Sequence, residues 1–422
     1  MNLFAFRPAG LAPFAVLLLS ASGLSAQIAG DLLWSTTTGG VLYSTPTIDA
    51  NDTIYIGSGD KKLYAIESNG SVKWTYTAGD WVDSTPALAD DGTIYVGSWD
   101  NKLHAVDKNG SAKWTFTTNS AVTAGPAVGV DGTIYFGSHD NFFYALEANG
   151  SKKWEYYAGQ PISSSAAIGQ DGTIYFGDGN GTFHALNPSG HVKWTYAVEQ
   201  VADANLSIES SPALDLDGNL YFGSANGFFY SLEDNGTGAV KRWDYETGDR
   251  VDSSPVLGPT GEVYFAGRDG YLRSLDTTNG IPNWEEAVGD VFYSSPVVDA
   301  NGTVYVASYA GGGQNHVFAF ESNGSLAWTT NVNGATVTIG DVVDAGLVLG
   351  PQGTLYVASF DKNLYALYAG STLGDTDWPK FRRDLSGTGR WPSFVIDANA
   401  SPAAAGSVTG AGTYNQGKSV SL

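Results

Sequence analysis

The chain contains no cysteine among its 422 residues. This absence excludes disulfide bonds, thiolate metal sites, a cysteine nucleophile and a lipid anchor on an N-terminal cysteine. Basic residues are also scarce, because 21 lysines and arginines stand against 43 acidic residues, which gives a formal net charge of −22. A field of this sign repels polyanions, so we expect no nucleic-acid partner and no binding to an anionic membrane surface.

The N-terminal apolar run is too short to cross a membrane. It covers residues 11–19 and is interrupted by Pro13, whereas a spanning helix needs about 20 apolar residues. Arg7 precedes the run and small residues follow it up to Ala26, which is typical of a cleavable export signal over residues 1–26. We therefore expect an exported mature chain without a transmembrane segment, located in the periplasm, in the medium or on the cell surface.

One sequence motif is repeated along the chain. The stretch LYAIESNGSVKW at residues 63–74 returns as LHAVDKNGSAKW, FYALEANGSKKW and FHALNPSGHVKW, each time 40 residues later. Between these stretches come segments such as DGTIYVGS, in which β-branched and aromatic residues follow a tight-turn dipeptide. A period near 40 residues with four short strands predicts a β-propeller.

The number of blades follows from the repeated strand that contains tyrosine. It occurs eight times, at Tyr55, Tyr95, Tyr135, Tyr175, Tyr221, Tyr264, Tyr305 and Tyr356. We predict an all-β fold, an eight-bladed propeller of four-stranded antiparallel blades over residues 27–376, which is expected to be monomeric. The strand around Trp34 precedes the first unit, so it should complete the last blade and remove an open sheet edge.

The repeated tryptophans indicate packing between blades. They are Trp34, Trp74, Trp114, Trp154, Trp194, Trp243, Trp284 and Trp328. A small residue, such as Ala65 or Ala105, recurs in the middle of the preceding strand. A large side chain facing a small one in every unit predicts a structural docking role rather than a cofactor site.

These segments together resemble the pyrroloquinoline-quinone (PQQ)-type propeller repeat of bacterial exported proteins, over residues 27–370. The resemblance implies the propeller fold but leaves the activity open. Its members include quinoprotein dehydrogenases, the propeller of the outer-membrane assembly machinery, and scaffolds without a cofactor. The phased Gly-His and Trp-Asp signatures of the WD-type propeller do not recur here.

The C-terminal part differs from the repeats. The segment DWPKFRRDLSGTGRW carries Lys380, Arg382, Arg383 and Arg390. We predict a capping segment over residues 377–396 that packs on the ring and pairs with its acidic rim, with an anion-binding site as the alternative. Residues 397–422 are predicted to be a linker and the start of a truncated β-repeat module. Their final stretch resembles the opening of an internalin-type B repeat, so we expect the chain to be a fragment.

Candidate binding residues come from positions that vary between otherwise similar units. The loop that enters the first strand of each blade and the loop after the second strand should lie at the same mouth of the central channel. The candidates are Trp81, Asp83, Trp99, His139, Glu209, Arg250, Asp252, Arg268, Tyr309 and Phe360. Aromatic and acidic side chains together suit a basic or polar peptide, or a sugar. Ordinary variation on an exposed rim is the alternative interpretation.

The sequence offers little for catalysis. His104 and His184 occupy core-strand positions, and no motif ties His139 to a nucleophile or a carboxylate. The resemblance implies that a quinone site would need calcium ligands, a cationic residue and often a cysteine pair, which is absent here. Asp215 and Asp217 lie in a turn motif that does not complete a calcium loop. We expect no catalytic residue, metal or cofactor.

The function predicted from the sequence is that of a non-catalytic exported scaffold. It would bind a protein or polysaccharide of the cell envelope at one mouth of its channel. The alternative is an oxidoreductase that uses PQQ and calcium to act on alcohols or sugars. A third class, binding or cleavage of a polysaccharide, would use the aromatic mouth.

Overall fold

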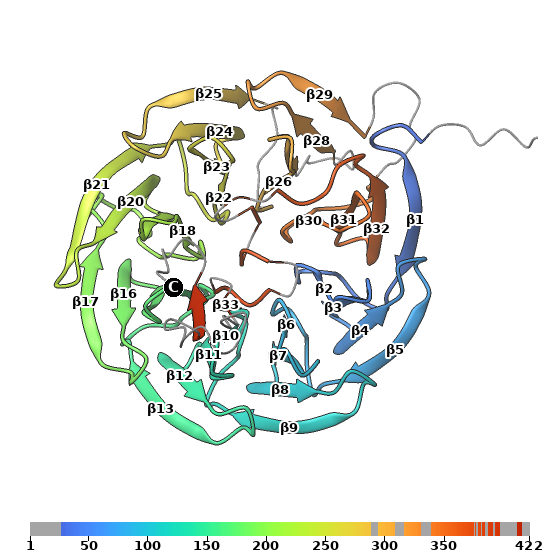
Figure 1. Cartoon of the computed structure of the whole chain (residues 1–422), viewed down its shortest axis with the longest axis horizontal. Coiled ribbons are helices and arrows are strands. Elements are labelled where there is room, and N and C mark those ends of the chain that lie inside the picture. The colour runs from blue at the N-terminus through green and yellow to red at the C-terminus, as the bar shows by residue number, and fades with distance from the viewer. Residues whose placement is uncertain are drawn as a thin grey trace, which may run out of the picture.

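The computed structural model shows a ring of eight four-stranded antiparallel sheets around a central channel (Figure 1). It describes residues 27–287, 294–308, 316–330, 339–374, 376, 379–380, 382–384, 387–390, 393–396 and 412–415. The predicted signal segment 1–26, Tyr309 and most of the predicted linker lie outside these residues. No helix able to cross a membrane occurs in the described part of the chain. The prediction of an eight-bladed all-β propeller is confirmed.

Each blade runs from a short strand at the channel to a long strand at the outside. Blades 1 to 4 contain β2 (Thr47–Ile48), β3 (Ile54–Ser58), β4 (Lys62–Ile66), β5 (Val72–Thr77); β6 (Ala87–Leu88), β7 (Ile94–Ser98), β8 (Lys102–Val106), β9 (Ala112–Thr117); β10 (Ala127–Val128), β11 (Ile134–Gly137), β12 (Phe142–Leu146), β13 (Lys152–Tyr157); β14 (Ala167–Ile168), β15 (Ile174–Gly177), β16 (Thr182–Leu186) and β17 (Val192–Ala197).

Blades 5 to 8 repeat the pattern, and the last of them takes its outer strand from the start of the chain. They contain β18 (Ala213–Leu214), β19 (Asn219–Gly223), β20 (Phe228–Asp234), β21 (Ala239–Glu246); β22 (Val256–Leu257), β23 (Glu262–Ala266), β24 (Tyr271–Asp276), β25 (Pro282–Ala287); β26 (Val297–Val298), β27 (Val304–Ala307), β28 (Val317–Phe320), β29 (Leu326–Thr329); β30 (Val348–Leu349), β31 (Thr354–Ala358), β32 (Asn363–Tyr368) and β1 (Leu32–Thr37).

The ring is closed by β1, which pairs antiparallel with β32. Trp34 lies opposite Ala366 in this pairing, as Trp74 lies opposite Ala65 in blade 1. Without β1 the last blade would present an unpaired edge along β32. The prediction that the N-terminal strand completes the last blade is confirmed.

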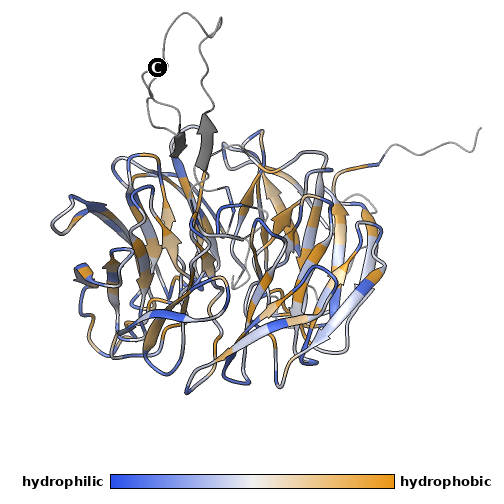
Figure 2. Cartoon of the chain, turned by 60° about the horizontal axis from the view of Figure 1, so that its bottom comes forward, coloured by the Kyte–Doolittle hydropathy of each residue, from blue (hydrophilic) through white to orange (hydrophobic). Residues whose placement is uncertain are grey.

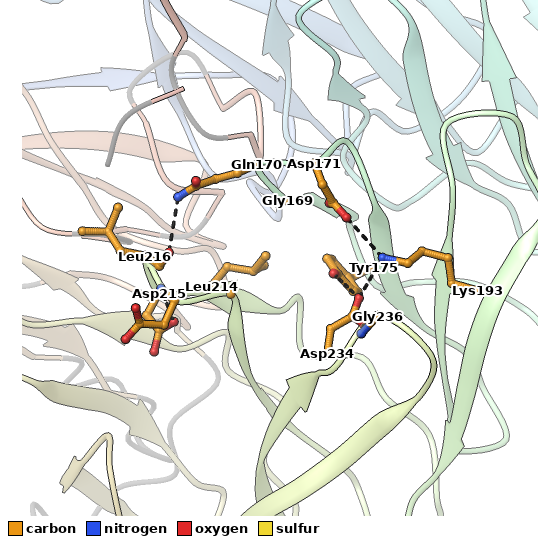
Figure 3. A pocket seen from close by; sticks show the side chains of 12 residues that line it. Gly169, Gln170, Asp171, Tyr175, Lys193, Leu214, Asp215, Leu216, Asp234 and Gly236 are labelled. Atoms are coloured by element: carbon orange, nitrogen blue, oxygen red, sulfur yellow. Dashed lines mark hydrogen bonds and ion pairs between the residues drawn. The ribbon is translucent and has the colours of Figure 1, made fainter. Parts of the chain in front are cut away.

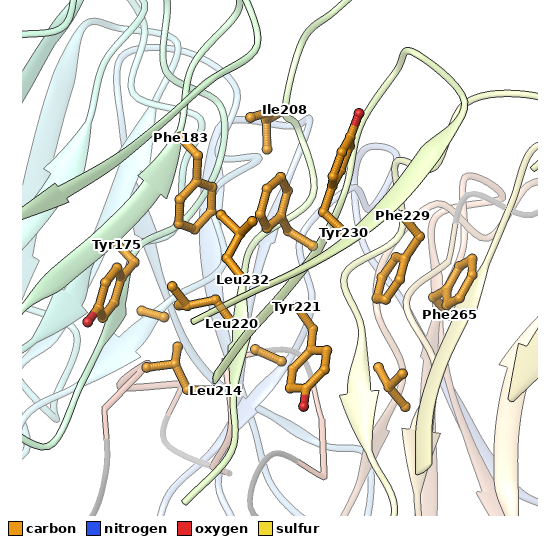
Figure 4. Packing of buried hydrophobic residues seen from close by; sticks show 14 of the residues in the cluster. Tyr175, Phe183, Ile208, Leu214, Leu220, Tyr221, Phe229, Tyr230, Leu232 and Phe265 are labelled. Atoms are coloured by element: carbon orange, nitrogen blue, oxygen red, sulfur yellow. The ribbon is translucent and has the colours of Figure 1, made fainter. Parts of the chain in front are cut away.

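Apolar side chains of adjacent sheets fill the space between the blades. All residues of β3 are buried, whereas every residue of the outer strand β5 is exposed or half-buried. Between blades 5 and 6, the rings of Phe229 and Phe265 lie face to face with centroids 3.9 Å apart (Figure 4). Hydrophobic residues accordingly concentrate along the strands in the side view (Figure 2). The core is a circular series of sheet interfaces.

The repeated indoles dock each outer strand on the next blade. Trp34 Nε1 donates a hydrogen bond to the backbone oxygen of Ser68 at 2.8 Å, and Trp74 makes the same bond to Lys108 at 3.0 Å. Beneath the Trp34 ring lies Gly70, whose φ is +87°; a Cβ atom there would come within 2.9 Å of the ring. A turn glycine is therefore required both by its backbone conformation and by the ring above it.

Described residues of the C-terminal segment lie across the channel in the view along its axis (Figure 1). Their backbone bonds place them at the end remote from the loops that enter the inner strands. The backbone N–H groups of Val128, Ile168 and Val298 donate to the carbonyl oxygens of Thr388, Gly389 and Pro379. These bonds cover inner-strand edges that would otherwise lack partners. The predicted boundaries of this segment remain predictions.

Two arginines of this segment contact the ring in different ways. Arg382 is 2% exposed and donates from Nη1 to the backbone oxygen of Thr85 at 3.2 Å. Gly125 leaves room for it, because a Cβ there would lie 2.5 Å from Arg382 Nη1. Arg390 pairs with Asp90 at 3.2 Å. Beyond it, β33 (Ser393–Ile396) and β34 (Gly412–Asn415) form a two-stranded sheet, and the resemblance to an internalin repeat remains a prediction.

Candidate functional site at one mouth of the channel

The two variable loops of each blade meet at one end of the channel. The backbone N–H groups of Trp99, His139 and Arg268 donate, each at 2.9 Å, to the carbonyl oxygens of Trp81, Ala121 and Arg250 respectively. This contact recurs around the ring because the β-strands are antiparallel and the loop lengths are similar. The geometry predicted for the two loops is therefore present. We call this end the mouth.

A cavity of about 340 Å³ opens at the mouth. Its walls include residues of the loops that enter the inner strands. They are Tyr43, Asp83, Thr123, Ser163, Glu209, Asp252 and Asp344, together with Arg268 from a neighbouring loop. The remaining candidates Trp81, Trp99, His139, Arg250 and Phe360 each contact one of these wall residues. Tyr309 lies outside the described residues.

Aromatic side chains gather on one arc of the mouth. The Tyr43 ring is stacked on Trp81 with centroids 6.1 Å apart and meets Phe360 edge-on at 4.3 Å. Trp99 meets His139 edge-on at 5.9 Å. Trp81 and Trp99 are 42% and 44% exposed, so this arc leaves apolar surface accessible.

The opposite arc carries paired charges from blades 5 and 6. Arg250 Nη2 lies 3.1 Å from both Glu209 Oε1 and Asp252 Oδ1. Arg268 Nε lies 2.5 Å from Asp252 Oδ2. These arginines neutralise the two carboxylates and hold the loops in place.

Two other carboxylates face the cavity without such a partner. Within the described part of the chain, neither Asp83 nor Asp344 forms an ion pair with a lysine or an arginine. Burial raises the pKa of Asp83 to about 6, although the hydrogen bond from Trp99 opposes the shift. Burial also raises the pKa of Asp344 to about 6, against the attraction of the more distant Arg268. The ionised forms are disfavoured because neither the Trp99 hydrogen bond nor the attraction of Arg268 makes up for the desolvation of the two carboxylates.

The structure brings His139 to two hydroxyl groups, a contact that was not predicted from the sequence. Its Nε2 lies 2.9 Å from Thr123 Oγ1 and 3.1 Å from Ser163 Oγ, which belong to blades 3 and 4. Burial lowers the pKa of His139, so the ring favours its neutral form. Among the described residues no carboxylate hydrogen-bonds to its Nδ1, and the third member of a catalytic triad is not present there.

Below the mouth, a belt of hydroxyl groups links neighbouring blades. Side-chain oxygens of one blade accept hydrogen bonds from backbone N–H groups of the preceding blade. The bonds run from Thr45 to Thr85 (3.3 Å), Gly125 to Ser165 (2.8 Å), Ser165 to Ser211 (2.9 Å), Ser211 to Ser254 (2.9 Å), Ser254 to Ser295 (2.9 Å) and Gly346 to Thr45 (2.8 Å). The repeated serine or threonine before the strand-opening proline was the signal for this belt. These groups stabilise the ring and form the cavity floor.

The two core histidines serve packing, as their positions indicated. His104 and His184 are 3% and 2% exposed. His104 bridges Asp100 and the hydroxyl of Tyr76. Each histidine joins an aspartate of its own blade to a tyrosine of the preceding blade, so both rings serve the packing of adjacent blades.

Comparison with known proteins places the chain in a family. The family model described as "Outer membrane protein assembly factor BamB" matches residues 23–121, 105–267 and 268–413. The chain belongs to this family. No curated protein sequence matches the chain.

Solved structures share the propeller architecture with this member of the BamB family. BamB from Moraxella catarrhalis is similar with a TM-score of 0.64 and 19% identity, covering 80% of this chain and 99% of that chain. The computationally designed protein Ika8 has a TM-score of 0.65 and 13% identity, and Sqt1 from Saccharomyces cerevisiae has 0.67 and 14%, both with the same coverage. At these identities the likeness shows the fold.

The mouth of this BamB-family chain does not suit pyrroloquinoline quinone. The quinone is a polycarboxylate, and its recognition needs free cationic donors. Arg250 and Arg268 are already engaged by Glu209 and Asp252, while Asp83 and Asp344 would repel the ligand. No group of three metal-ligating side chains with suitable geometry occurs among the described residues. We therefore derive no chemistry through this cofactor.

A second cavity of about 200 Å³ lies between blades 4 and 5 at the other end of the ring (Figure 3). There Lys193 Nζ lies 3.1 Å from both Asp171 and Asp234, and Tyr175 donates to Asp234 at 2.7 Å. Asp215, from the turn considered for calcium, accepts hydrogen bonds from Asn219 and Tyr221. These acidic groups are occupied by neighbouring side chains that join the blades.

Proposed function

We propose that this protein is a non-catalytic scaffold that binds a protein partner at the mouth of its channel during outer-membrane assembly. In this proposal the chain is exported by its N-terminal segment, works in the cell envelope and needs no cofactor. The family description, which names an assembly factor, supports the class of function.

The observation that carries the proposal is the difference between the two ends of the channel. The mouth presents exposed Trp81 and Trp99 beside a cavity of about 340 Å³. The other end is crossed by the C-terminal segment, whose backbone bonds to inner strands of three blades. Exposed aromatic side chains around a concave centre are the residues that most often dominate protein–protein binding energy.

Photo-crosslinking in cells that express the whole chain tests this proposal. Benzoylphenylalanine at position 81 replaces one aromatic ring of the mouth with another. The matched control places it at Tyr157, which is 61% exposed on the outer strand β13. We expect a discrete protein adduct from position 81 and none from position 157. Adducts at both positions, at neither, or only with polysaccharide would contradict the proposal.

A further inference from the structure

The aromatic arc of the mouth contains two carboxylates, Asp83 and Asp344, that form no ion pair with a lysine or an arginine of the described residues. Tyr43 of blade 1 lies between the carboxylates in the loops that enter the inner strands of blades 2 and 8. Its pKa is raised by burial and by both Asp83 and Asp344. The three side chains line the same cavity. Asp83 Oδ2 accepts a hydrogen bond from Trp99, but its Oδ1 is buried without a partner.

This arrangement is costly for the free protein. A buried carboxylate without a countercharge loses hydration that no internal contact replaces. Glu209 and Asp252 of the same mouth avoid this cost through Arg250 and Arg268. A cationic group of a binding partner would therefore gain more binding free energy at Asp83 and Asp344 than at Glu209 and Asp252.

The surroundings of the two carboxylates decide which kind of cation fits. No described group of three metal-ligating side chains with suitable geometry exists, which disfavours a bare metal ion. The rings of Tyr43 and Trp81 instead offer apolar and π surface beside the carboxylates. A guanidinium on an aliphatic stem matches both features, since it forms charge-assisted hydrogen bonds and packs against aromatic faces.

We propose that the mouth recognises an arginine side chain of the partner protein, which enters the cavity between Asp83 and Asp344 and packs against Tyr43 and Trp81. This inference rests on the proposed function and names the chemistry of its partner. On the opposite arc, Arg250 and Arg268 already neutralise Glu209 and Asp252. The positive charge of an incoming arginine is therefore expected to pair with the carboxylates of the aromatic arc.

Three capped pentapeptides test the inference, with glycine and serine around a central arginine, lysine or citrulline. Citrulline keeps the shape of arginine without its charge. Ligand-observed NMR titration of the whole chain at neutral pH should show the arginine peptide binding at least about tenfold tighter than the citrulline peptide. The lysine peptide should bind with an affinity between those of the other two peptides. The double variant Asp83→Asn and Asp344→Asn should remove the difference.

A matched variant controls for net charge. Asp217→Asn with Glu233→Gln removes two exposed acidic groups away from the mouth, and it should keep the preference for arginine. Equal binding of arginine and citrulline, or no binding of arginine up to about 5 mM, would overturn the inference. If position 81 still crosslinks a protein in that case, the proposed function stands and only the arginine is wrong.

Discussion

At the scale of residues, Asp83 and Asp344 differ from the other acidic side chains of the mouth in their surroundings. Both have a pKa near 6 because they are buried without a paired cation. A carboxyl group whose pKa is raised on folding favours the folded state only when it is protonated. Above about pH 6 both groups therefore reduce the free energy of unfolding, and this reduction disappears as the pH falls toward the ordinary aspartate value.

The variant Asp344→Asn should therefore stabilise the protein in a pH-dependent way. At about pH 8 we expect the free energy of unfolding to rise by roughly 1 to 2 kcal/mol, with little change at about pH 4. Urea denaturation followed by circular dichroism measures both values. Asp217→Asn, an exposed substitution at the other end, should change neither. A loss of stability at about pH 8 would contradict the account of Asp344.

Residues of the candidate site could be predicted from the sequence only where one repeat unit differs from its neighbours. Asp83, Glu209 and Asp252 stood out in this way, and the structure places them in one cavity. The contacts of His139 with Ser163 and of Arg250 with Glu209 could not be predicted. They join side chains 24 and 41 residues apart on different blades, and loop conformation decides which side chains meet.

At the scale of elements, the hairpin between the third and fourth strands supports the indole of the preceding blade in blades 1 to 4, 6 and 7. Gly150 has a φ of +87°, and a Cβ there would lie 2.7 Å from the ring of Trp114. Gly132 in the same blade also has a positive φ, +78°, but its Cβ would meet only Ala148 at 3.9 Å. The two glycines separate backbone strain from steric contact with the indole.

Gly150→Ala should therefore destabilise the protein more than Gly132→Ala. The backbone penalty of about 1 to 2 kcal/mol is common to both substitutions, and overlap with the Trp114 ring should add about 1 to 3 kcal/mol at Gly150. Chemical denaturation of the two variants measures the difference. Equal losses of stability would show that the indole does not press on this hairpin.

The sequence predicted this element well in one respect and incompletely in another. It predicted that each tryptophan faces a small residue, and Trp74 lies opposite Ala65. It missed the hairpin glycine on the other side and the N–H bond to the next blade, as in Trp34 to Ser68. The turn conformation alone explains a glycine in a turn dipeptide. Its contact with the indole of the preceding blade becomes visible only when the blades are stacked.

At the scale of the whole molecule, closure depends on one strand from the start of the chain. β1 supplies the outer strand of blade 8, and Trp34 joins that blade to blade 1 through Ser68. The eightfold count and this closure could be predicted because every unit repeats one pattern. The backbone contacts of Pro379, Thr388 and Gly389 with the inner strands could not be predicted, since such contacts leave no periodic signal.

Deletion of residues 27–37 should open the ring. The edge of β32 and the hairpin under Trp34 would then lose their partners, which favours edge-to-edge association. We expect a lower thermal midpoint and concentration-dependent oligomers in light scattering coupled to size exclusion. The double substitution Leu32→Ala and Thr37→Ala, which keeps the backbone of β1, should remain monomeric. A stable monomer after the deletion would show that β1 does not close the ring.

The central claim is that this propeller engages a protein partner through one end only. Its most direct test compares benzoylphenylalanine at position 81 in the mouth with the same residue at Leu216, which is 43% exposed at the opposite end. The account predicts a partner protein crosslinked from position 81 and not from position 216. The reverse result, with capture at 216 and none at 81, would contradict it.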